Sequence, residues 1–243
     1  MNASLDRIKN EWFKISSGKL SEPYQVEDFM SSFNEISRRL MEYIANIQDS
    51  NGNTALHYAV SHCNFEIVSL LLDTGVIDLS KQNKAGYTST MLATLAYTQT
   101  DRQREVVQRL FSMADTNAKA AKDGQTALML AVSQGRTDMV TQLLECGADV
   151  NVQDNEGSTA LMCACEHGHT DIVKTLLAHP DCDSTLSDND GCTALSIAME
   201  AGHKDIGVIV YAHNNFKSHN SPAIVKKRKT SGNTSPLPSP TIR

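Results

Sequence analysis

The sequence has little of what marks several common protein classes. Only 5% of its 243 residues are aromatic, so a core must come mainly from aliphatic residues and methionine. No run approaches the roughly 20 apolar residues that a membrane-spanning helix needs. The N-terminus also lacks the basic and then apolar segment of a signal peptide. We therefore expect no direct insertion into a membrane.

The six cysteines are scattered rather than framed as in a small secreted scaffold, which favours a reduced, cytosolic setting. The glycines are spread along the chain instead of forming a phosphate-binding loop. No convergent set of acid, base and nucleophile is visible. The sequence thus predicts no cofactor and no enzymatic activity.

Charge is distributed unevenly. The chain carries a formal net charge of −6, but after His213 it holds six basic residues and no acid. Residues 1–213 therefore have 16 basic and 28 acidic side chains. An acidic body repels phosphates, so we expect no nucleic-acid ligand. It favours a basic or amphipathic peptide instead.

What the sequence does contain is a repeated phrase, Gly-x-Thr. It begins at Gly52, Gly86, Gly124, Gly157 and Gly191, at steps of 34, 38, 33 and 34 residues. A period near 33 that opens in this way resembles the ankyrin repeat, in which helix pairs stack into a solenoid. The sequence predicts an all-α fold: an ankyrin-repeat solenoid of five repeats.

Each part of the repeat has a physical role. Glycine permits a turn with positive φ, and the threonine hydroxyl can accept a backbone N–H at the start of the first helix. Small alanines let helices pack closely, and apolar residues at helical spacing bury one face of the second helix. The phrase therefore predicts a turn, a capped helix and a second amphipathic helix in every repeat.

Three regions follow from this pattern. Residues 1–47 are not repeat-like, and their apolar residues predict two helices, one over 5–15 and a longer one over 26–44. We expect this two-helix N-terminal cap to cover the first repeat, with an independent partner-binding helix as the alternative. Residues 48–213 hold the five repeats. Residues 214–243 form a basic tail rich in Ser and Pro, which its composition predicts to be disordered.

Repeat two is longer than the others. Its extra residues fall around 97–104, between its two helices. A helix extension or solvated loop is favoured, because insertions usually lie on the surface. The alternative is a feature at the rim of the binding groove.

Two local clusters admit a chemical interpretation and a structural one. Cys163, Cys165, His167 and His169 have ligand-like residue types, but residues two apart on a helix do not share a face, so we expect packing rather than metal binding. Asn151 resembles the sites that asparaginyl hydroxylase modifies, and it can equally stabilise a turn between repeats.

The tail also contains short motifs. Residues 226–229, Lys-Lys-Arg-Lys, resemble a nuclear import signal or a solvated basic linker, which leaves nuclear shuttling open. Residues 235–238, Ser-Pro-Leu-Pro, resemble the motif captured by a microtubule end-binding protein.

Several stretches of the sequence resemble one particular family of ankyrin-repeat proteins. The chain resembles the C-terminal ankyrin domain of the Kank family, the KN-motif and ankyrin-repeat proteins, over about residues 3–216. The stretches that carry the resemblance are residues 3–15, Asp73-Thr-Gly-Val, Gln82-Asn-Lys-Ala-Gly-Tyr87, Leu186-Ser-Asp-Asn-Asp-Gly191 and Tyr211-Ala-His213.

This resemblance implies a scaffold at the cell cortex near focal adhesions. It also implies a partner, a short peptide segment of a kinesin-4 family motor, which would link adhesion complexes to microtubules. The family's KN motif and coiled coil are not in this sequence, so it looks like a fragment or a short isoform.

From the residues, we expect a peptide groove along the turn tips, the position after each glycine and the end of each first helix. The first half is aromatic and polar and the second half is acidic, which suits a basic amphipathic peptide. The predicted contacts are Asn53, Tyr58, Ser61, His62, Lys84, Tyr87, Asn155, Glu156, Ser158, Glu166, His167, Asp190 and Glu200.

The leading hypothesis is therefore a non-enzymatic protein-binding scaffold or adaptor in the cytoplasm. The alternative is a nuclear or cytosolic regulatory cofactor that holds a transcription or signalling protein through its repeats.

Overall fold

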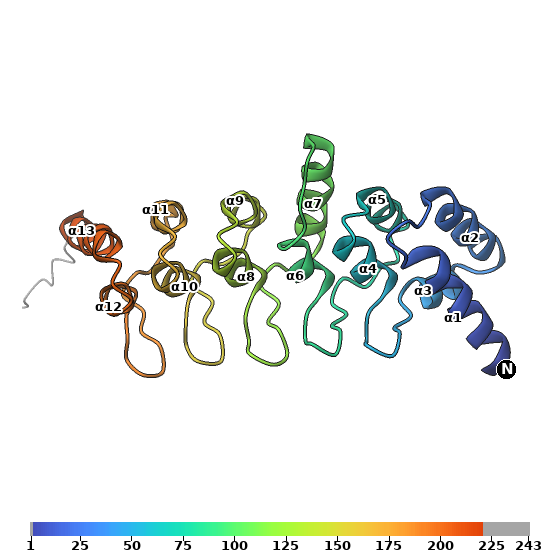
Figure 1. Ribbon diagram of the computed structural model, residues 1–243, viewed down its shortest axis with the longest axis horizontal. Coiled ribbons are helices and arrows are strands. Elements are labelled where there is room, and N and C mark those ends of the chain that lie inside the picture. The colour runs from blue at the N-terminus through green and yellow to red at the C-terminus, as the bar shows by residue number, and fades with distance from the viewer. Residues whose placement is uncertain (1, 221–243) are drawn as a thin grey trace, which may run out of the picture.

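Helices dominate the chain. The computed structural model describes the backbone of residues 2–220 and the side chains of residues 4–216. This part contains thirteen α-helices, and its only β pairing consists of two isolated bridges, Gln82–Thr88 and Ser187–Thr193. The predicted all-α solenoid is confirmed (Figure 1).

Five helix pairs stack side by side in two rows (Figure 1). The inner helices are α4 (Ala55–Ser61), α6 (Ser89–Ala93), α8 (Ala127–Ser133), α10 (Ala160–Glu166) and α12 (Ala194–Glu200). The outer helices are α5 (Phe65–Asp73), α7 (Asp101–Met113), α9 (Thr137–Glu145), α11 (Thr170–Ala178) and α13 (Lys204–Asn220).

A hairpin loop, which we call a finger, precedes each inner helix. The fingers are residues 49–53, 83–87, 120–125, 154–158 and 188–192, each closed by a backbone hydrogen bond between its first and last residue. The threonine that follows each finger accepts the N–H of the third residue of the inner helix, as predicted. Loss of such a cap typically costs about 0.5–2 kcal/mol.

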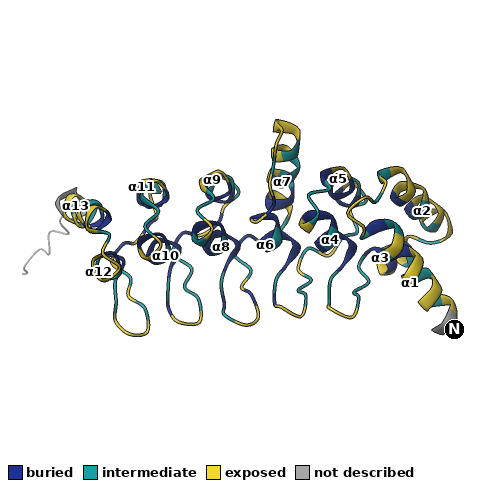
Figure 2. Ribbon diagram, viewed as in Figure 1, coloured by how far each residue is buried: buried dark blue, intermediate teal, exposed yellow. Residues whose placement is uncertain are grey.

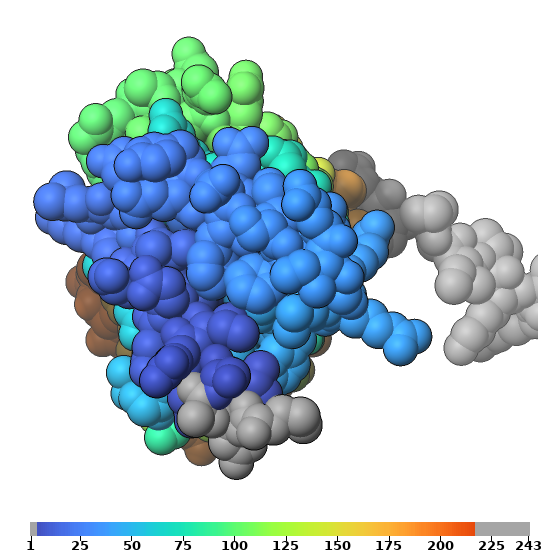
Figure 3. All heavy atoms as spheres, turned by 90° about the vertical axis from the view of Figure 1, so that its right-hand side faces the viewer, coloured from blue at the N-terminus to red at the C-terminus, as the bar shows by residue number. Residues whose placement is uncertain are grey.

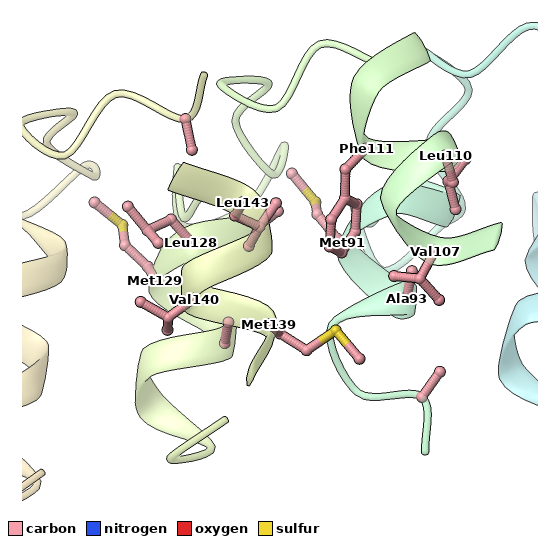
Figure 4. Close-up of a cluster of buried hydrophobic side chains, with 14 of the residues drawn as sticks. Met91, Ala93, Val107, Leu110, Phe111, Leu128, Met129, Met139, Val140 and Leu143 are labelled. Carbon is pink, nitrogen blue, oxygen red and sulfur yellow. The ribbon is translucent and has the colours of Figure 1, made fainter. Parts of the chain in front are cut away.

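The core runs along the whole stack between the two rows (Figure 2). It is mostly aliphatic, with methionines from successive inner helices. Figure 4 shows the contact between repeats two and three, where Phe111 of α7 and Met139 of α9 lie among leucines and valines. Both side chains are fully buried. Methionine suits this position because its flexible chain fills irregular gaps between stacked repeats.

The N-terminal cap contains three helices rather than the two predicted. These are α1 (Asn2–Ser16), α2 (Pro23–Ile36) and α3 (Arg38–Ala45). The long helix expected over 26–44 is interrupted at Ser37, whose backbone is extended with φ −166° and ψ 123°. The interruption changes the direction of the chain, so that α3 contacts both α2 and α1.

The cap covers the end of the stack. Helix α1 packs against the inner helix α4, and α2 packs against the outer helix α5. Trp12 of α1 is fully buried and stacks on Phe29 of α2 with ring centroids 5.6 Å apart. Figure 3 shows the three cap helices spread over this end, with α7 rising above them.

The insertion in repeat two lengthens an outer helix. Helix α7 has 13 residues, whereas α5, α9 and α11 have nine each. It projects from the outer row, on the side opposite to the fingers (Figure 1). Arg109 of α7 forms an ion pair with Asp73 of α5 at 2.6 Å. The structure therefore agrees with a surface extension. The alternative, a feature at the rim of the groove, stays a prediction, because Thr100 and Gln103 line a hollow together with His62.

The last helix extends past the predicted start of the tail at 214, since α13 continues to Asn220. No turn into a further finger interrupts it. The rest of the predicted disordered tail, including both of its short motifs, lies outside the described residues.

Replacing Trp12 with alanine should destabilise the protein by about 3–5 kcal/mol, because the substitution leaves a cavity between α1 and α2. Chemical denaturation of the full chain measures this change. Trp12→Phe should cost much less, because the buried Nε1 has no hydrogen-bond partner to lose. Tyr24→Ala is the control, since that side chain is 65% exposed. Equal effects for Trp12→Ala and Tyr24→Ala would show that the cap does not support the stack.

Candidate interaction surface

The fingers and the exposed ends of the inner helices make one surface, which we call the inner face. All five fingers project to the same side of the stack, and their tips are the most exposed part of each loop (Figures 1 and 2). This surface contains the positions at which the sequence predicts peptide contacts.

Hydrogen bonds between neighbouring repeats hold the fingers at fixed spacing. A backbone N–H near each later finger tip donates to a carbonyl of the preceding finger, as from Lys84 to Asn51 at 2.8 Å and from Asn189 to Glu156 at 2.9 Å. Side chains add a parallel set, as when Gln153 Nε2 donates to the carbonyl of Ser187 at 2.9 Å. The inner face is therefore preorganised, which lowers the entropic cost of binding a partner.

The aspartate at the base of a finger is used internally. Asp154 Oδ1 accepts the backbone N–H groups of Glu156 and Ser158 at 3.0 and 2.8 Å. Asp188 accepts those of Asp190 and Cys192 in the same way. These carboxylates shape the turn, so they are not the charges that a partner meets.

Tyr58 is tied into the protein rather than free. Its hydroxyl donates to Asp49 Oδ2 at 2.6 Å, and its ring meets Phe13 of α1 edge-on with centroids 6.3 Å apart. Burial alone would raise the pKa of Asp49, but the hydrogen bonds from Tyr58 and from the finger backbone outweigh it and lower the pKa. Tyr58 therefore forms part of the wall of the inner face, and its role as a peptide contact stays a prediction.

The other predicted residues of the first half differ in availability. Ser61 and Lys84 are exposed, whereas His62 and Tyr87 are half-buried. Asn53 Oδ1 accepts from Asn83 Nδ2 at 3.0 Å, so this side chain links two fingers.

Sequence reasoning missed Leu95, which is 49% exposed at the end of the first helical segment of repeat two. Leu95 lies at the same distance from the glycine of its repeat as Ser61, Ser133, Glu166 and Glu200 do, so an alignment of the five repeats identifies it. Leu95 is thus an apolar side chain in a position that is polar in the other four repeats. The partly buried Leu92 lies one turn before it.

The predicted residues of the second half are mostly exposed. Asn155 links two neighbouring fingers, because its side chain donates to the carbonyl of Lys122 at 3.1 Å. Ser158 is half-buried, and His167 stacks on His169 with centroids 5.9 Å apart. Four exposed carboxylates remain that form no ion pair with any other described residue: Glu156, Glu166, Asp190 and Glu200.

The cysteines of α10 are held as thiols. Burial raises the pKa of Cys163 and that of Cys165 to about 12, and Cys165 is fully buried. Within residues 2–220, no group of three or more His, Cys, Asp or Glu side chains is placed to hold a metal ion. In the same range, no helix is both long and apolar enough to cross a membrane.

Asn151 has a structural role between repeats. Its Nδ2 donates to the carbonyl of Asp181 at 2.7 Å, and its Oδ1 accepts the N–H of Asp183 at 2.8 Å. Asn46 and Asn117 accept the N–H groups of Asp78 and Asp149 in the same way. Stabilisation of the turn therefore accounts for Asn151 in this position.

His57 connects the first inner helix to the second finger. Its Nδ1 accepts the backbone N–H of Thr54 at 3.2 Å, which places the proton on Nε2, and Nε2 lies 3.1 Å from the carbonyl oxygen of Tyr87. Burial lowers the pKa of His57 below its ordinary value of 6.5. A second proton would fall on Nδ1, which could then no longer accept the backbone N–H of Thr54.

Comparison with known proteins agrees with this architecture. The family model described as ankyrin repeats (3 copies) matches residues 29–120, 78–154, 94–186 and 128–221. Over 108 residues, 43% of this chain, the sequence is 35% identical to the B-cell lymphoma 3 protein homolog of Mus musculus. Over 105 residues, also 43% of the chain, it is 29% identical to the BTB/POZ domain and ankyrin repeat-containing protein NPR2 of Oryza sativa subsp. japonica. The matches span 23% and 15% of these two relatives.

The thermal stability of the protein should fall as the pH drops below about 6.5, because the unfolded state then binds a proton that His57 excludes in the folded state. This contribution is complete above 6.5 and is lost as the pH falls toward the lowered pKa. Melting temperatures between pH 7.5 and 5 measure it. His57→Met should flatten this part of the profile, because methionine does not titrate. The position accepts methionine, since Met129 and Met162 are its equivalents in repeats three and four.

The control is His167→Gln, since His167 is exposed. That variant should keep the full pH dependence. An unchanged profile in His57→Met would show that His57 is not the group that titrates.

Proposed function

This chain belongs to the ankyrin-repeat family, and from that premise we propose that it is a non-enzymatic adaptor whose inner face captures a short segment of another protein. The observation that carries the proposal is Leu95, an apolar side chain 49% exposed on the preorganised inner face, in a position that is polar in the other four repeats. A few residues carry most of the affinity of an interface, and covering an exposed leucine removes apolar surface from water.

The charges of the inner face indicate the chemistry of the partner. Glu166, Asp190 and Glu200 are exposed and unpaired among the described residues, and they lie on repeats four and five. A segment with an apolar anchor at repeat two and Lys or Arg toward repeats four and five would complement both features. A short basic amphipathic peptide has these properties.

The resemblance to the Kank family makes the proposal more specific. We infer that the captured peptide comes from a kinesin-4 family motor. On this proposal the protein acts in the cytoplasm at the cell cortex near focal adhesions, where it links adhesion complexes to microtubules. The Ser-Pro-Leu-Pro stretch at 235–238 would add a contact with a microtubule end-binding protein.

A second candidate function is that of a regulatory cofactor that holds a transcription or signalling protein through the same inner face. The basic stretch Lys226-Lys-Arg-Lys229 favours it, because such a cluster resembles a nuclear import signal.

Leu95→Asp should weaken binding by about tenfold or more, because it places a charge where an apolar anchor docks. The probe is a set of overlapping 25-residue peptides that tile the non-motor part of a kinesin-4 chain, and affinity is measured by fluorescence anisotropy. Glu166→Lys combined with Glu200→Lys should weaken binding roughly 3- to 10-fold at low salt and less at high salt, because salt screens exposed charges.

Matched controls exist on the outer row. Met113 of α7 is 48% exposed, so Met113→Asp introduces the same charge on a different face. Glu105→Lys with Glu145→Lys repeats the charge reversal on exposed residues of the outer helices α7 and α9. The kinesin-4 partner is ruled out if no peptide binds. The assignment of the inner face fails if these controls weaken binding as much as the inner-face variants.

The two candidate functions predict different cellular distributions. A fluorescently tagged chain and a version truncated after Asn220 should both locate at the cell cortex if the adaptor proposal is right, because the inner face is intact in both. Fluorescence imaging of adherent cells measures this. Nuclear accumulation that disappears with the tail would favour the regulatory cofactor instead.

A further inference from the structure

A cavity of about 630 Å³ lies at the N-terminal end of the inner face, between α1 and the first finger. Helix α1 lines it with Lys9, Phe13 and Lys14, and the first repeat contributes Asp49 and Tyr58. We call it the end pocket. The cap therefore does more than cover the first repeat, because it extends the inner face by one wall.

The net charge of the end pocket is positive. Asp49 is satisfied internally: Oδ2 accepts the Tyr58 hydroxyl and Oδ1 accepts two backbone N–H groups of the finger at 2.8 Å. Lys9 Nζ donates one hydrogen bond, to the carbonyl of Gln48 at 2.6 Å, and an ammonium has three N–H groups. Its two other donors are available to a ligand.

Lys14 is also available. Its only ion pair within the described residues is with Glu11 at 3.4 Å, and the two side chains are 73% and 53% exposed. An exposed pair of this kind is weak and exchanges readily with another anion. The end pocket thus presents two ammonium groups beside the edge-to-face pair of Phe13 and Tyr58.

Resting on the proposed function, we propose that the end pocket receives a carboxylate of the captured segment, from an acidic side chain or from its C-terminus, beside an apolar residue that packs on Phe13 and Tyr58. Charge-assisted hydrogen bonds to the two lysines would hold the carboxylate. The aromatic pair would contact the neighbouring apolar group.

This pocket gives the bound segment a direction. The exposed carboxylates of the inner face gather at the opposite end, on repeats four and five, as Glu166, Asp190 and Glu200. A segment with its carboxylate at α1 and its basic residues at α10–α12 pairs with both ends, whereas the reversed segment meets like charges at both. The partner is therefore charge-segregated rather than uniformly basic.

The separation of the two ends sets the length of the segment. Four inner-row steps lead from α1 through α4, α6 and α8 to α10. Packed helices lie about 8–10 Å apart, so the span is roughly 32–40 Å. An extended chain covers about 3.3 Å per residue, which gives roughly 10–12 residues between the carboxylate and the basic residues.

The test is selection of linear 16-residue peptides, displayed with free carboxyl termini, on the full chain. We expect the enriched peptides to carry an acidic residue or the free terminus beside an apolar residue, with Lys or Arg at the other end in one constant order. The enriched peptides are then synthesised in soluble form, with Asp→Asn or with an amidated C-terminus. The change that removes the bound carboxylate should weaken peptide binding about 3- to 10-fold, and the other change should not.

In a protein that carries both Lys9→Gln and Lys14→Gln, removal of the peptide carboxylate should no longer weaken binding, because the carboxylate has no ammonium partner there. The matched control is Lys174→Gln, since Lys174 forms the same i,i+3 surface pair, with Asp171, on the outer helix α11. In this control, removal of the peptide carboxylate should still weaken binding about 3- to 10-fold.

The outcomes separate this inference from the proposed function. Peptides that bind through Leu95 but show no carboxylate preference, or keep it in the double lysine variant, overturn the end pocket alone. If no peptide is enriched, both proposals are overturned.

Discussion

The stacking of one repeat on the next is the constraint on which the rest of this structure depends. A helix pair of this size cannot bury its apolar faces alone, so every repeat relies on its neighbours for a core. The stack also fixes the backbone at defined places. A Cβ at Gly157 would lie 2.8 Å from the backbone nitrogen of Asn189, so the approach of the fifth finger to the fourth requires a glycine there. The same approach creates the hydrogen bonds that hold the inner face rigid.

Each end of the stack has a repeat with a neighbour on one side alone, and its apolar face is covered differently at the two ends. At the N-terminus the cap buries Trp12 and places α1 beside the first inner helix, so the non-repetitive part continues the geometry of the repeats. At the C-terminus, Gly191 and Gly202 have φ near +83°, yet a Cβ added to either would meet nothing within 4 Å. The long helix α13 closes the stack here, with Val208 and Tyr211 mostly exposed.

Sequence reasoning succeeds where a feature repeats and fails where it occurs once. The Gly-x-Thr phrase predicts the fold because five copies of one local rule must all be satisfied. The break at Ser37 was not predictable, because the apolar period continues through it and only the packing of α3 on α2 requires the turn. The hydrogen bond between Tyr58 and Asp49 was not predicted, because it joins two segments that no local pattern relates. Leu95, in contrast, was within reach of the register and was missed.

The acidic residues show why counting charges is not enough to describe a binding surface. Asp49, Asp154 and Asp188 stand at the bases of fingers, and their carboxylate oxygens accept backbone N–H groups that shape the turns. Glu166 and Glu200 end inner helices and have no such partners. The same residue class therefore builds the surface in one position and is available to a ligand in the other. Because one end of the inner face has unpaired carboxylates and the other has the ammonium groups of Lys9 and Lys14, the arrangement favours one orientation of a bound chain over its reverse.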